Sequence, residues 1–419
     1  MSRVTRIKGF ADMFPPESDV FTRMQDCARA VFCRYGFMEL RTPVLEFAEL
    51  FSRSIGSETD VVQKEMYTFP DRKGRSLSLR PEATAGVMRA FLDASLFNRE
   101  PVSRLFTMGP MFRYERPQLG RMRQFHQINC ECLGSDSPVA DAELIAMLLF
   151  FLADLGVKDL TLKINSLGCA ECRPRYRAAL AAYLARVDQS TLCTDCVRRV
   201  LTNPLRVLDC KHPACKALTA QAPKILDCQC PDCGRHFDAV LAFLRLHDVG
   251  VEQDHRLMRG LDYYCRTTFE VVSGAIGAQA AVAGGGRYDG LVKTLGGPDI
   301  PGVGFACGME RLALLLDKKQ QLRPDFYLLA MDATVQPQVF VLGQKLRAAG
   351  LSGLLNFTPA GFKSLMRQAG RSGARYCLII GQNEAAAGLV TVKNMKNGVQ
   401  NAMPEADVFH FLQAGISHD

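Results

Sequence analysis

The sequence lacks an apolar run long enough to cross a lipid bilayer. The longest such run, Leu144–Ala153, is much shorter than the ~20 residues of a membrane helix, and Glu143 and Asp154 flank it. It predicts a buried helix instead, with Ser137 as the N-cap and Pro138 at the first helical position. The basic N-terminal residues are not followed by an apolar stretch, so we expect no secretory or transit segment. These absences favour a cytoplasmic protein with no membrane partner.

The chain also lacks a large excess of either charge. It has 51 Lys and Arg residues against 43 Asp and Glu residues, which gives a formal net charge of +8. A mildly basic protein can bind a polyanion, but this charge does not require one. No internal repeat or low-complexity tract is present. The 419 residues, of which 48% are hydrophobic, suffice for two or three globular domains.

The first segment, residues 1 to about 167, is predicted to form an antiparallel sheet that is preceded by an amphipathic helix. Apolar residues recur at helical spacing from Val20 to Tyr35, and Gly36 ends this helix. Strand-like runs then follow one another with polar turns between them, which is typical of antiparallel sheets and not of βαβ units. These runs are Met38–Val44, Met66–Phe69, Ser76–Leu79, Arg104–Met111 and Gln124–Leu133.

Residues 168–246 differ in composition, because they hold nine of the sixteen cysteines. We interpret them as an insertion within a first domain of residues 1–322, since strand-like runs resume after them. The last of these runs, Gly302–Cys307, leads into a predicted helix over Met309–Leu316.

Residues 324–419 are predicted to be a separate α/β domain, in which strands and helices alternate before a hairpin around Asn397-Gly398. Basic residues recur every four positions from Lys363 to Arg375. The first two, Lys363 and Arg367, lie on one face of the predicted helix. They either contact RNA or belong to an ordinary solvated surface. The predicted elements are strands at Phe326–Met331, Gly353–Phe357, Tyr376–Ile380, Leu389–Met395 and Val399–Met403, and helices at Gln336–Ala349 and Phe362–Ala369.

Charged residues in apolar or glycine-rich segments are the candidates for chemistry. Glu82 follows a strand and opens a helix. It either complements the helix dipole, which is common, or holds a substrate ammonium together with Thr84.

A second candidate is the strand–loop–strand over residues 106–131. Because alternate residues share a face of a strand, Phe125, Gln127, Asn129 and Glu131 are predicted to line one surface beside Arg113. An aromatic ring on that surface argues against a simple solvated face. Phe125 can stack on a purine ring, and Arg113 can hold a phosphate through paired N–H bonds.

A third candidate is the glycine-rich strand Gly302–Gly308, which runs into a helix with Arg311 in its first turn. Small residues allow a base or a phosphate to approach the backbone closely. The dinucleotide-binding fingerprint is excluded, because Cys307 stands in place of its third glycine and no βαβ unit surrounds it.

With these segments in order, the chain resembles the histidyl-tRNA synthetases, a family of class II aminoacyl-tRNA synthetases. Arg113 in its strand–loop–strand is similar to motif 2, and Arg311 is similar to motif 3. The helix and strand that end at Pro43 resemble motif 1, which builds a homodimer interface in this class. Arg259–Tyr264 and Ala283–Gly290 resemble two segments peculiar to the histidine enzymes.

The resemblance covers nearly the whole chain and implies a class II fold. That fold is an α+β catalytic domain, built on a mixed, mainly antiparallel sheet, followed by a C-terminal α/β anticodon-binding domain. The implied activity is a histidine–tRNA ligase. It activates L-histidine with ATP to histidyl-adenylate and pyrophosphate, and then esterifies the terminal adenosine of tRNA(His). The cofactors implied are ATP and Mg²⁺.

The resemblance also implies a role for each matching residue. Arg113 and Arg259 hold the α-phosphate, and Arg259 stands where related synthetases use a metal. Arg311 and Arg121 hold the γ-phosphate, while Phe125 stacks on adenine. Arg259 also belongs to the histidine-binding residues, among which Glu82, Thr84 and Gln127 contact the ammonium. Glu131 and Tyr264 contact the imidazole, and Tyr263 and Tyr288 form the wall. Arg116 and Gln118 meet the acceptor end of tRNA.

The cysteines of the insertion show the spacing of zinc ligands. Twenty residues separate the pair Cys169 and Cys172 from the pair Cys193 and Cys196, which matches a four-thiolate site. A second site is predicted from Cys210, Cys215, Cys230 and Cys233, with Cys228 left over. The alternative is that these thiols hold no metal. In either case we expect a structural role and not catalysis.

Two other functions compete with the ligase. One is the catalytically silent paralogue that binds histidine as a regulatory subunit of ATP phosphoribosyltransferase. It normally lacks the C-terminal domain, whereas this chain has that domain and keeps Glu82, Arg113, Glu131, Arg259 and Arg311. The other is a zinc-ribbon nucleic-acid-binding module, in which the glycine-rich strand before Arg311 has no purpose.

Overall fold

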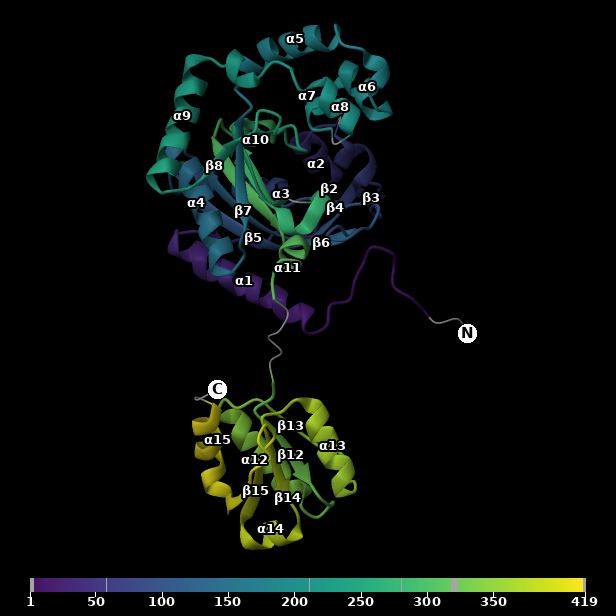
Figure 1. Ribbon diagram of the computed structural model, residues 1–419, viewed down its shortest axis with the longest axis vertical. Helices are drawn as coiled ribbons and strands as arrows, with labels where there is room; N and C mark the ends of the chain where they lie inside the picture. The colour runs from purple at the N-terminus through teal and green to yellow at the C-terminus, as the bar shows by residue number, and fades with distance from the viewer. Residues whose placement is uncertain (1–3, 58, 211, 280, 318–322, 417–419) are drawn as a thin grey trace. The chain divides into compact units, whose positions relative to one another are not determined.

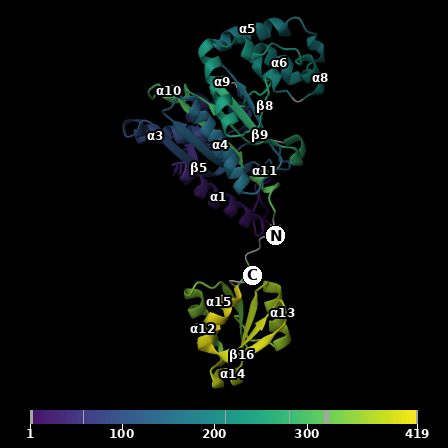
Figure 2. The same cartoon turned by 60° about the vertical axis from the view of Figure 1, so that its left-hand side comes forward.

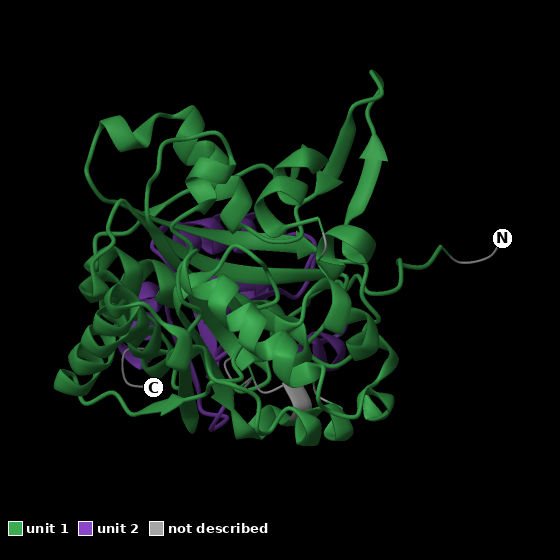
Figure 3. Cartoon of the chain, turned by 90° about the horizontal axis from the view of Figure 1, so that it is seen from above, with its two compact units in different colours: residues 1–319 green, residues 320–419 purple. Residues whose placement is uncertain are grey.

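The structure is a computed structural model, and it describes residues 4–57, 59–210, 212–279, 281–317 and 323–416. The chain divides into two compact units, residues 1–319 and 320–419, which are coloured separately in Figure 3. The predicted domain boundary at residues 322–324 lies partly outside the described residues. Within the described residues, no helix combines the length and the apolar character that a membrane crossing requires.

The first unit is built on an eight-stranded mixed sheet (Figure 1). The β1–β5 and β7–β8 pairs are parallel and the other neighbours are antiparallel, so the predicted mixed, mainly antiparallel sheet is confirmed. In spatial order, the strands are β1 (Met38–Glu39), β5 (Ser103–Phe112), β6 (Gln124–Leu133), β11 (Gly302–Gly308), β10 (Ala281–Arg287), β9 (Cys265–Ser273), β7 (Leu160–Ser166) and β8 (Val251–Gln253).

Two long helices cover one face of this sheet, α1 (Glu17–Arg34) and α4 (Pro138–Asp154). The core lies between helices and sheet. The ring of Phe32 on α1 packs against Phe106 of β5 and Phe305 of β11, at centroid distances of 5.5 and 5.9 Å. The predicted cap of α4 is present, because the Ser137 hydroxyl accepts a hydrogen bond from the Val139 amide at 3.3 Å. These helices leave the other face of β6, β10 and β11 available for a site.

A small sheet forms from β2 (Leu45–Phe47), β4 (Ser76–Leu79) and β3 (Tyr67–Pro70), with α2 (Ala48–Ile55) and α3 (Thr84–Asp93) nearby. The prediction of one strand over Met38–Val44 was wrong. Only β1 joins the large sheet, and the chain then passes through Pro43, which has no N–H to donate to a ladder. The guanidinium of Arg80 holds this crossing by donating to the Thr42 carbonyl at 3.0 Å.

The insertion is helical, and it connects β7 to β8 (Figures 1 and 2). Its helices are α5 (Cys172–Leu184), α6 (Thr194–Thr202), α7 (Leu205–Leu208), α8 (Pro213–Leu218) and α9 (Pro231–Leu246). Tyr176, Leu180 and Leu184 of α5 belong to a buried cluster that also contains Met258 and Tyr264. The insertion therefore shares its core with the segment that carries Arg259.

The second unit has a five-stranded sheet with parallel strands first and an antiparallel hairpin at one edge. In order these are β13 (Gly353–Leu355), β12 (Phe326–Ala330), β14 (Tyr376–Ile380), β15 (Leu389–Asn394) and β16 (Gln400–Pro404). Gly398 has a φ of 77° in the hairpin turn, as its sequence predicts. The helices are α12 (Gln336–Ala348), α13 (Phe362–Ser372), α14 (Gln382–Ala387) and α15 (Val408–Ile416), of which the last two were not predicted.

Candidate active site

A cavity of about 310 Å³ lies on the face of the large sheet that α1 and α4 leave open. It brings together segments that are far apart in the chain, and twelve of the predicted catalytic and substrate-binding residues line it. They are Glu82, Thr84, Arg113, Arg121, Phe125, Gln127, Glu131, Arg259, Tyr263, Tyr264, Tyr288 and Arg311. Arg116 and Gln118 do not line it. Both are exposed in the loop between β5 and β6, where Gln118 pairs with Arg121.

Strand β6 supplies the floor of the cavity. Its alternate residues Phe125, Gln127, Asn129 and Glu131 all line the cavity, as the period of a strand requires. Residues between them point the other way, and Ile128 and Cys130 are fully buried in the core under α1 and α4. One strand thus serves the core and the site at once.

Glu131 lies at the buried end of this row and is 1% exposed. The Thr84 hydroxyl donates to its Oε1 at 2.8 Å, and the Tyr288 hydroxyl donates to its Oε2. Burial raises the pKa of Glu131 from 4.5 to about 8, despite these two donors. Gly304 is its partner on β11, and a Cβ there would collide with Oε2 and with the Cys130 carbonyl. The glycine-rich strand therefore makes room for this carboxylate.

Glu82 binds the N-terminus of α3 and also lines the cavity. Its carboxylate oxygens accept the Thr84 amide at 2.8 Å and the Ala85 amide at 2.7 Å, which are the first free amides of α3. Glu82 therefore lies where a carboxylate complements the helix dipole, and it also lines the cavity. Burial raises the pKa of this carboxyl, although the two amides and Arg113 act in the opposite direction.

Two amide oxygens in the cavity have no partner among the described residues. They are Oε1 of Gln127 and Oδ1 of Asn129, and both atoms are buried. A buried acceptor without a partner costs about 1–3 kcal/mol. These oxygens therefore favour a ligand that brings N–H donors, such as an ammonium. Asn129 was placed on this face from the sequence, but no role was predicted for it.

Arg259 reaches the cavity from the segment before β9. Its Nη1 donates to Oε1 of Glu270 at 2.6 Å, and its guanidinium carbon lies 5.4 Å from the centre of the Tyr264 ring. Burial alone would lower the pKa of Arg259, but Tyr264 and Glu270 outweigh it and raise that pKa. Glu270 was missed by sequence analysis. Its signal is its position on β9 opposite Gly284, whose missing side chain leaves the space that the guanidinium occupies.

The other arginines form a cationic wall. Arg113 donates from Nε to the Pro81 carbonyl at 2.9 Å and stacks near Phe125, with 5.4 Å from guanidinium carbon to ring centre. Arg121 pairs with Glu115 at 3.1 Å, and Arg311 donates to the Ala281 carbonyl at 2.7 Å. Burial lowers the pKa of Arg311, and the neighbouring Arg121 and Arg113 lower it further. Cations that repel one another in a partly buried site favour an anionic ligand.

Three tyrosines close the end of the cavity near Glu131. The ring centres of Tyr263 and Tyr264 are 4.6 Å apart, and those of Tyr263 and Tyr288 are 5.6 Å apart. Glu131 and Tyr264, which are predicted to contact opposite nitrogens of the imidazole, both line the cavity. In the structure the Tyr288 hydroxyl donates to Glu131, and the Tyr264 ring lies against Arg259.

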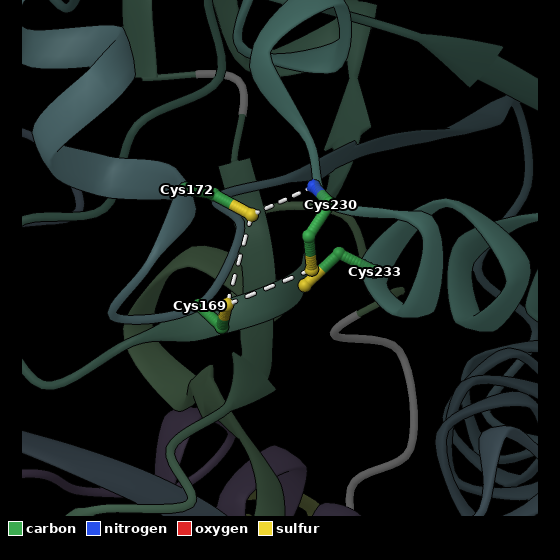
Figure 4. Close-up of side chains that lie close together, drawn as sticks. All are labelled: Cys169, Cys172, Cys230 and Cys233. Carbon is green, nitrogen blue, oxygen red and sulfur yellow. Dashed lines mark hydrogen bonds between the residues drawn. The ribbon is translucent and has the colours of Figure 1, made fainter.

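The cysteines of the insertion form two groups, but the predicted grouping was wrong. Cluster A consists of Cys169, Cys172, Cys230 and Cys233, and cluster B of Cys193, Cys196, Cys210 and Cys215. Spacing along the chain led us to join the first two Cys-x-x-Cys pairs. The helices instead fold back, so that the start of α9 meets the start of α5. Cluster A is shown in Figure 4.

Comparisons with known proteins agree over the full chain. Residues 9–312 match the family model "Histidyl-tRNA synthetase" and residues 325–415 match "Anticodon binding domain". A protein of Nitratidesulfovibrio vulgaris named "Histidine--tRNA ligase" is 63% identical over 416 residues, which cover 99% of this chain and 100% of that protein. One of the same name from Geobacter sulfurreducens is 49% identical, with 96% and 97% covered.

Solved structures show the same similarity. The apo histidyl-tRNA synthetase of Staphylococcus aureus superposes with a TM-score of 0.80 at 31% identity, and covers 99% of this chain and 100% of that one. A Bacillus halodurans protein, described as an ATP phosphoribosyltransferase regulatory subunit/histidyl-tRNA synthetase, has a TM-score of 0.66 at 19% identity, with 87% and 96% covered. That second likeness concerns the fold alone.

Proposed function

The chain belongs to the histidyl-tRNA synthetase family, and we propose that the cavity on its large sheet is where it activates histidine with ATP. The enzyme is a histidine–tRNA ligase, a class II aminoacyl-tRNA synthetase. The regulatory-subunit alternative is not favoured, because full-length relatives at high identity carry the ligase name. The observation that supports the proposed site is the convergence of Glu82, Glu131 and the arginines on one cavity.

In the first step, an oxygen of the histidine carboxylate forms a bond to the α-phosphorus of ATP. The bond from that phosphorus to the bridging oxygen breaks, and pyrophosphate leaves with the electron pair. The nucleophile is already an anion, so no strong base is needed, and the barrier lies in the charge that builds on phosphate. We assign Arg113 and Arg259 to the α-phosphate. Arg121 and Arg311 hold the γ-phosphate, and Phe125 stacks on the adenine.

Mg²⁺ accompanies ATP and takes oxygen ligands, commonly one or two carboxylates together with phosphate oxygens. Glu115 and Glu310 line the cavity beside Arg121 and Arg311, so the available donors fit this ion. When bound, Mg²⁺ neutralises charge on the pyrophosphate portion.

Histidine would lie with its ammonium near Glu82, Thr84 and Gln127. The buried Gln127 oxygen that has no partner among the described residues supports this placement. The imidazole would point to Glu131 and Tyr264, with Tyr263 and Tyr288 in the wall. An amino acid with an apolar side chain would leave these buried polar groups unpaired, which rejects competitors strongly.

In the second step, the oxygen of the 2′- or 3′-hydroxyl of the terminal adenosine of tRNA(His) forms a bond to the acyl carbon. The bond from that carbon to the phosphate oxygen breaks, AMP leaves with the electron pair, and the hydroxyl proton is released. Arg116 and Gln118 are exposed in the β5–β6 loop and are proposed to meet the acceptor end. The second unit is proposed to bind the anticodon. We further propose a homodimer through the motif 1 region, a cytoplasmic location, and structural Zn²⁺ in the insertion.

Histidine-dependent exchange between labelled pyrophosphate and ATP tests the proposed site. The enzyme should exchange in the absence of tRNA, and only when histidine is the amino acid supplied. Exchange should fall by at least about a hundredfold when Arg113 becomes Ala, because one fixed cation at the reacting phosphate is lost. Full exchange in the Arg113→Ala protein would rule out this cavity as the activation site.

A further inference from the structure

The two cysteine clusters have the dimensions of occupied metal sites. In each cluster the four sulfur atoms lie within 4.8 Å of one another. Cys169 Sγ lies 3.6 Å from Cys172 Sγ and 3.9 Å from Cys230 Sγ (Figure 4), and Cys193 Sγ lies 3.8 Å from Cys210 Sγ. Four sulfurs at about 2.3 Å from a tetrahedral Zn²⁺ are about 3.8 Å apart. The measured separations match this edge length, and they are far longer than a disulfide bond of about 2.05 Å.

Backbone amides also donate hydrogen bonds to a sulfur atom in each cluster. The Cys230 amide donates to Cys172 Sγ at 3.1 Å in cluster A, and the Cys193 amide donates to Cys215 Sγ at 3.3 Å in cluster B. Hydrogen bonds from N–H groups stabilise the negative charge of sulfur ligands. Sulfurs this close leave room for one ion and not for a cluster of several irons with bridging sulfides.

We propose that the insertion binds two Zn²⁺ ions, one in cluster A and one in cluster B. Along the chain, all four ligands of cluster B lie between the two Cys-x-x-Cys pairs of cluster A. Four thiolates in a tetrahedron are a typical ligand set of Zn²⁺, and a site closed by four protein ligands is structural. The ion in cluster A ties together the two ends of the insertion, at the starts of α5 and α9. The ion in cluster B lies inside that loop and ties the start of α6 to Cys210, which follows α7, and to Cys215 in α8.

Cluster B is connected to the segment that carries Arg259. Arg206 of α7 donates to the Gly260 carbonyl at 2.7 Å and to Asp262 at 3.1 Å. Conversely, Arg256 of the segment that carries Arg259 donates to two carbonyls of the insertion, those of Leu208 and Lys216, at 3.3 and 3.0 Å. Leu208 and Lys216 are within two residues of the cluster B ligands.

The ion in cluster B would therefore fix the part of the insertion that contacts the chain on both sides of Arg259. Before Arg259, the carbonyls of Leu208 and Lys216 hold Arg256, and after it the side chain of Arg206 holds Gly260 and Asp262. We assign cluster B a positioning role for this arginine, and this second part of the inference rests on the proposed function of Arg259. The metal sites themselves do not rest on it. Metal content and activity are measured separately, so the two ideas can fail independently.

Metal analysis of full-length protein, purified without chelator, tests the sites and their grouping. The wild type should contain two zinc ions per chain. Replacing all four cysteines of cluster A with serine should leave one ion, and the same change in cluster B should also leave one. The grouping in order of sequence predicts none in either variant, because each variant would then remove half of the ligands of both sites. The matched control Cys33→Ser, at an exposed thiol of α1, should keep two.

If a fourfold variant fails to fold, titration of the wild-type protein with a mercurial reagent replaces it. Thiols outside the clusters, such as the exposed Cys33, should react without releasing metal. The eight cluster thiols should release two zinc ions, one for each four of them that react. Iron in place of zinc, no bound metal, or disulfides within the clusters would overturn the proposal. For positioning, the cluster B variant should lose at least about tenfold in kcat for pyrophosphate exchange while it still binds histidine. Wild-type exchange in that variant would overturn the positioning role.

Discussion

Gly284 provides a sharp test of how the site is built, because its side chain is missing where Arg259 needs space. A Cβ added at Gly284 would lie 2.9 Å from both Cζ and Nη2 of Arg259, and closer still to Nη1. Ordinary contact between such atoms begins at about 3.5 Å. The Gly284→Ala substitution must therefore push the guanidinium away by roughly 1 Å. Its ion pair with Glu270, now 2.6 Å long, prevents it from swinging freely.

The expected effect is on the rate and not on the fold. A misplacement of about 1 Å at a catalytic group costs about a hundredfold in rate, so kcat for histidine-dependent pyrophosphate exchange should fall by about that factor. Histidine binding should change little, because the carboxylates and tyrosines of the pocket are untouched.

The matched control is Gly250→Ala, where an added Cβ would meet no described atom within 4 Å and the backbone φ is ordinary. The control should exchange at the wild-type rate. Both variants should unfold near the wild-type temperature. Wild-type exchange by a folded Gly284→Ala protein would refute the proposal that Arg259 works from its present position.

Three further predictions follow from the same geometry. Arg259→His should lower pyrophosphate exchange by about a hundredfold or more and leave histidine binding measurable by calorimetry; full exchange would defeat the assigned role. Arg206→Ala removes the hydrogen bonds to Gly260 and Asp262, so kcat should fall by about tenfold with little change in the KM for histidine, and an unchanged kcat would contradict positioning. Since burial raises the pKa of Glu131 from 4.5 to about 8, the folded protein holds a proton that the unfolded chain releases. The free energy of unfolding of the ligand-free protein, measured in urea, should therefore fall as the pH rises from 4.5 to 8, by at most about 1.4 kcal/mol per pH unit relative to the Glu131→Gln protein. A difference between the two proteins that stays constant over this range would exclude the pKa shift.

Patterns that depend on neighbouring residues could be predicted from the sequence. The period of β6 placed Phe125, Gln127 and Glu131 on one face, and the boundaries of β4, β6 and β14 match their predicted runs. The N-cap at Ser137 was predicted from two adjacent residues and is present. These features need no knowledge of the rest of the fold, because side-chain period and cap chemistry act within a few residues.

Features that depend on distant segments could not be predicted. The two cysteine clusters are joined across helices of the insertion, so spacing along the chain gave the wrong grouping. The pairing of Glu270 with Arg259 depends on the register of β9 against β10, which no local pattern specifies. The fully buried ion pair of Arg287 with Asp141 was missed for the same reason, because it joins β10 to α4.

The boundary of one helix was also predicted incorrectly. The helix predicted over Met309–Leu316 ends earlier, at Ala313.

The central claim is that the carboxylates and arginines of this cavity surround one aminoacyl nucleotide. Crystallography of the protein with a non-hydrolysable analogue of histidyl-adenylate tests it most directly. We predict that the imidazole lies against Glu131, the phosphate-like group between Arg113 and Arg259, and the adenine on Phe125. An analogue bound outside this cavity, or reversed within it, would contradict the claim.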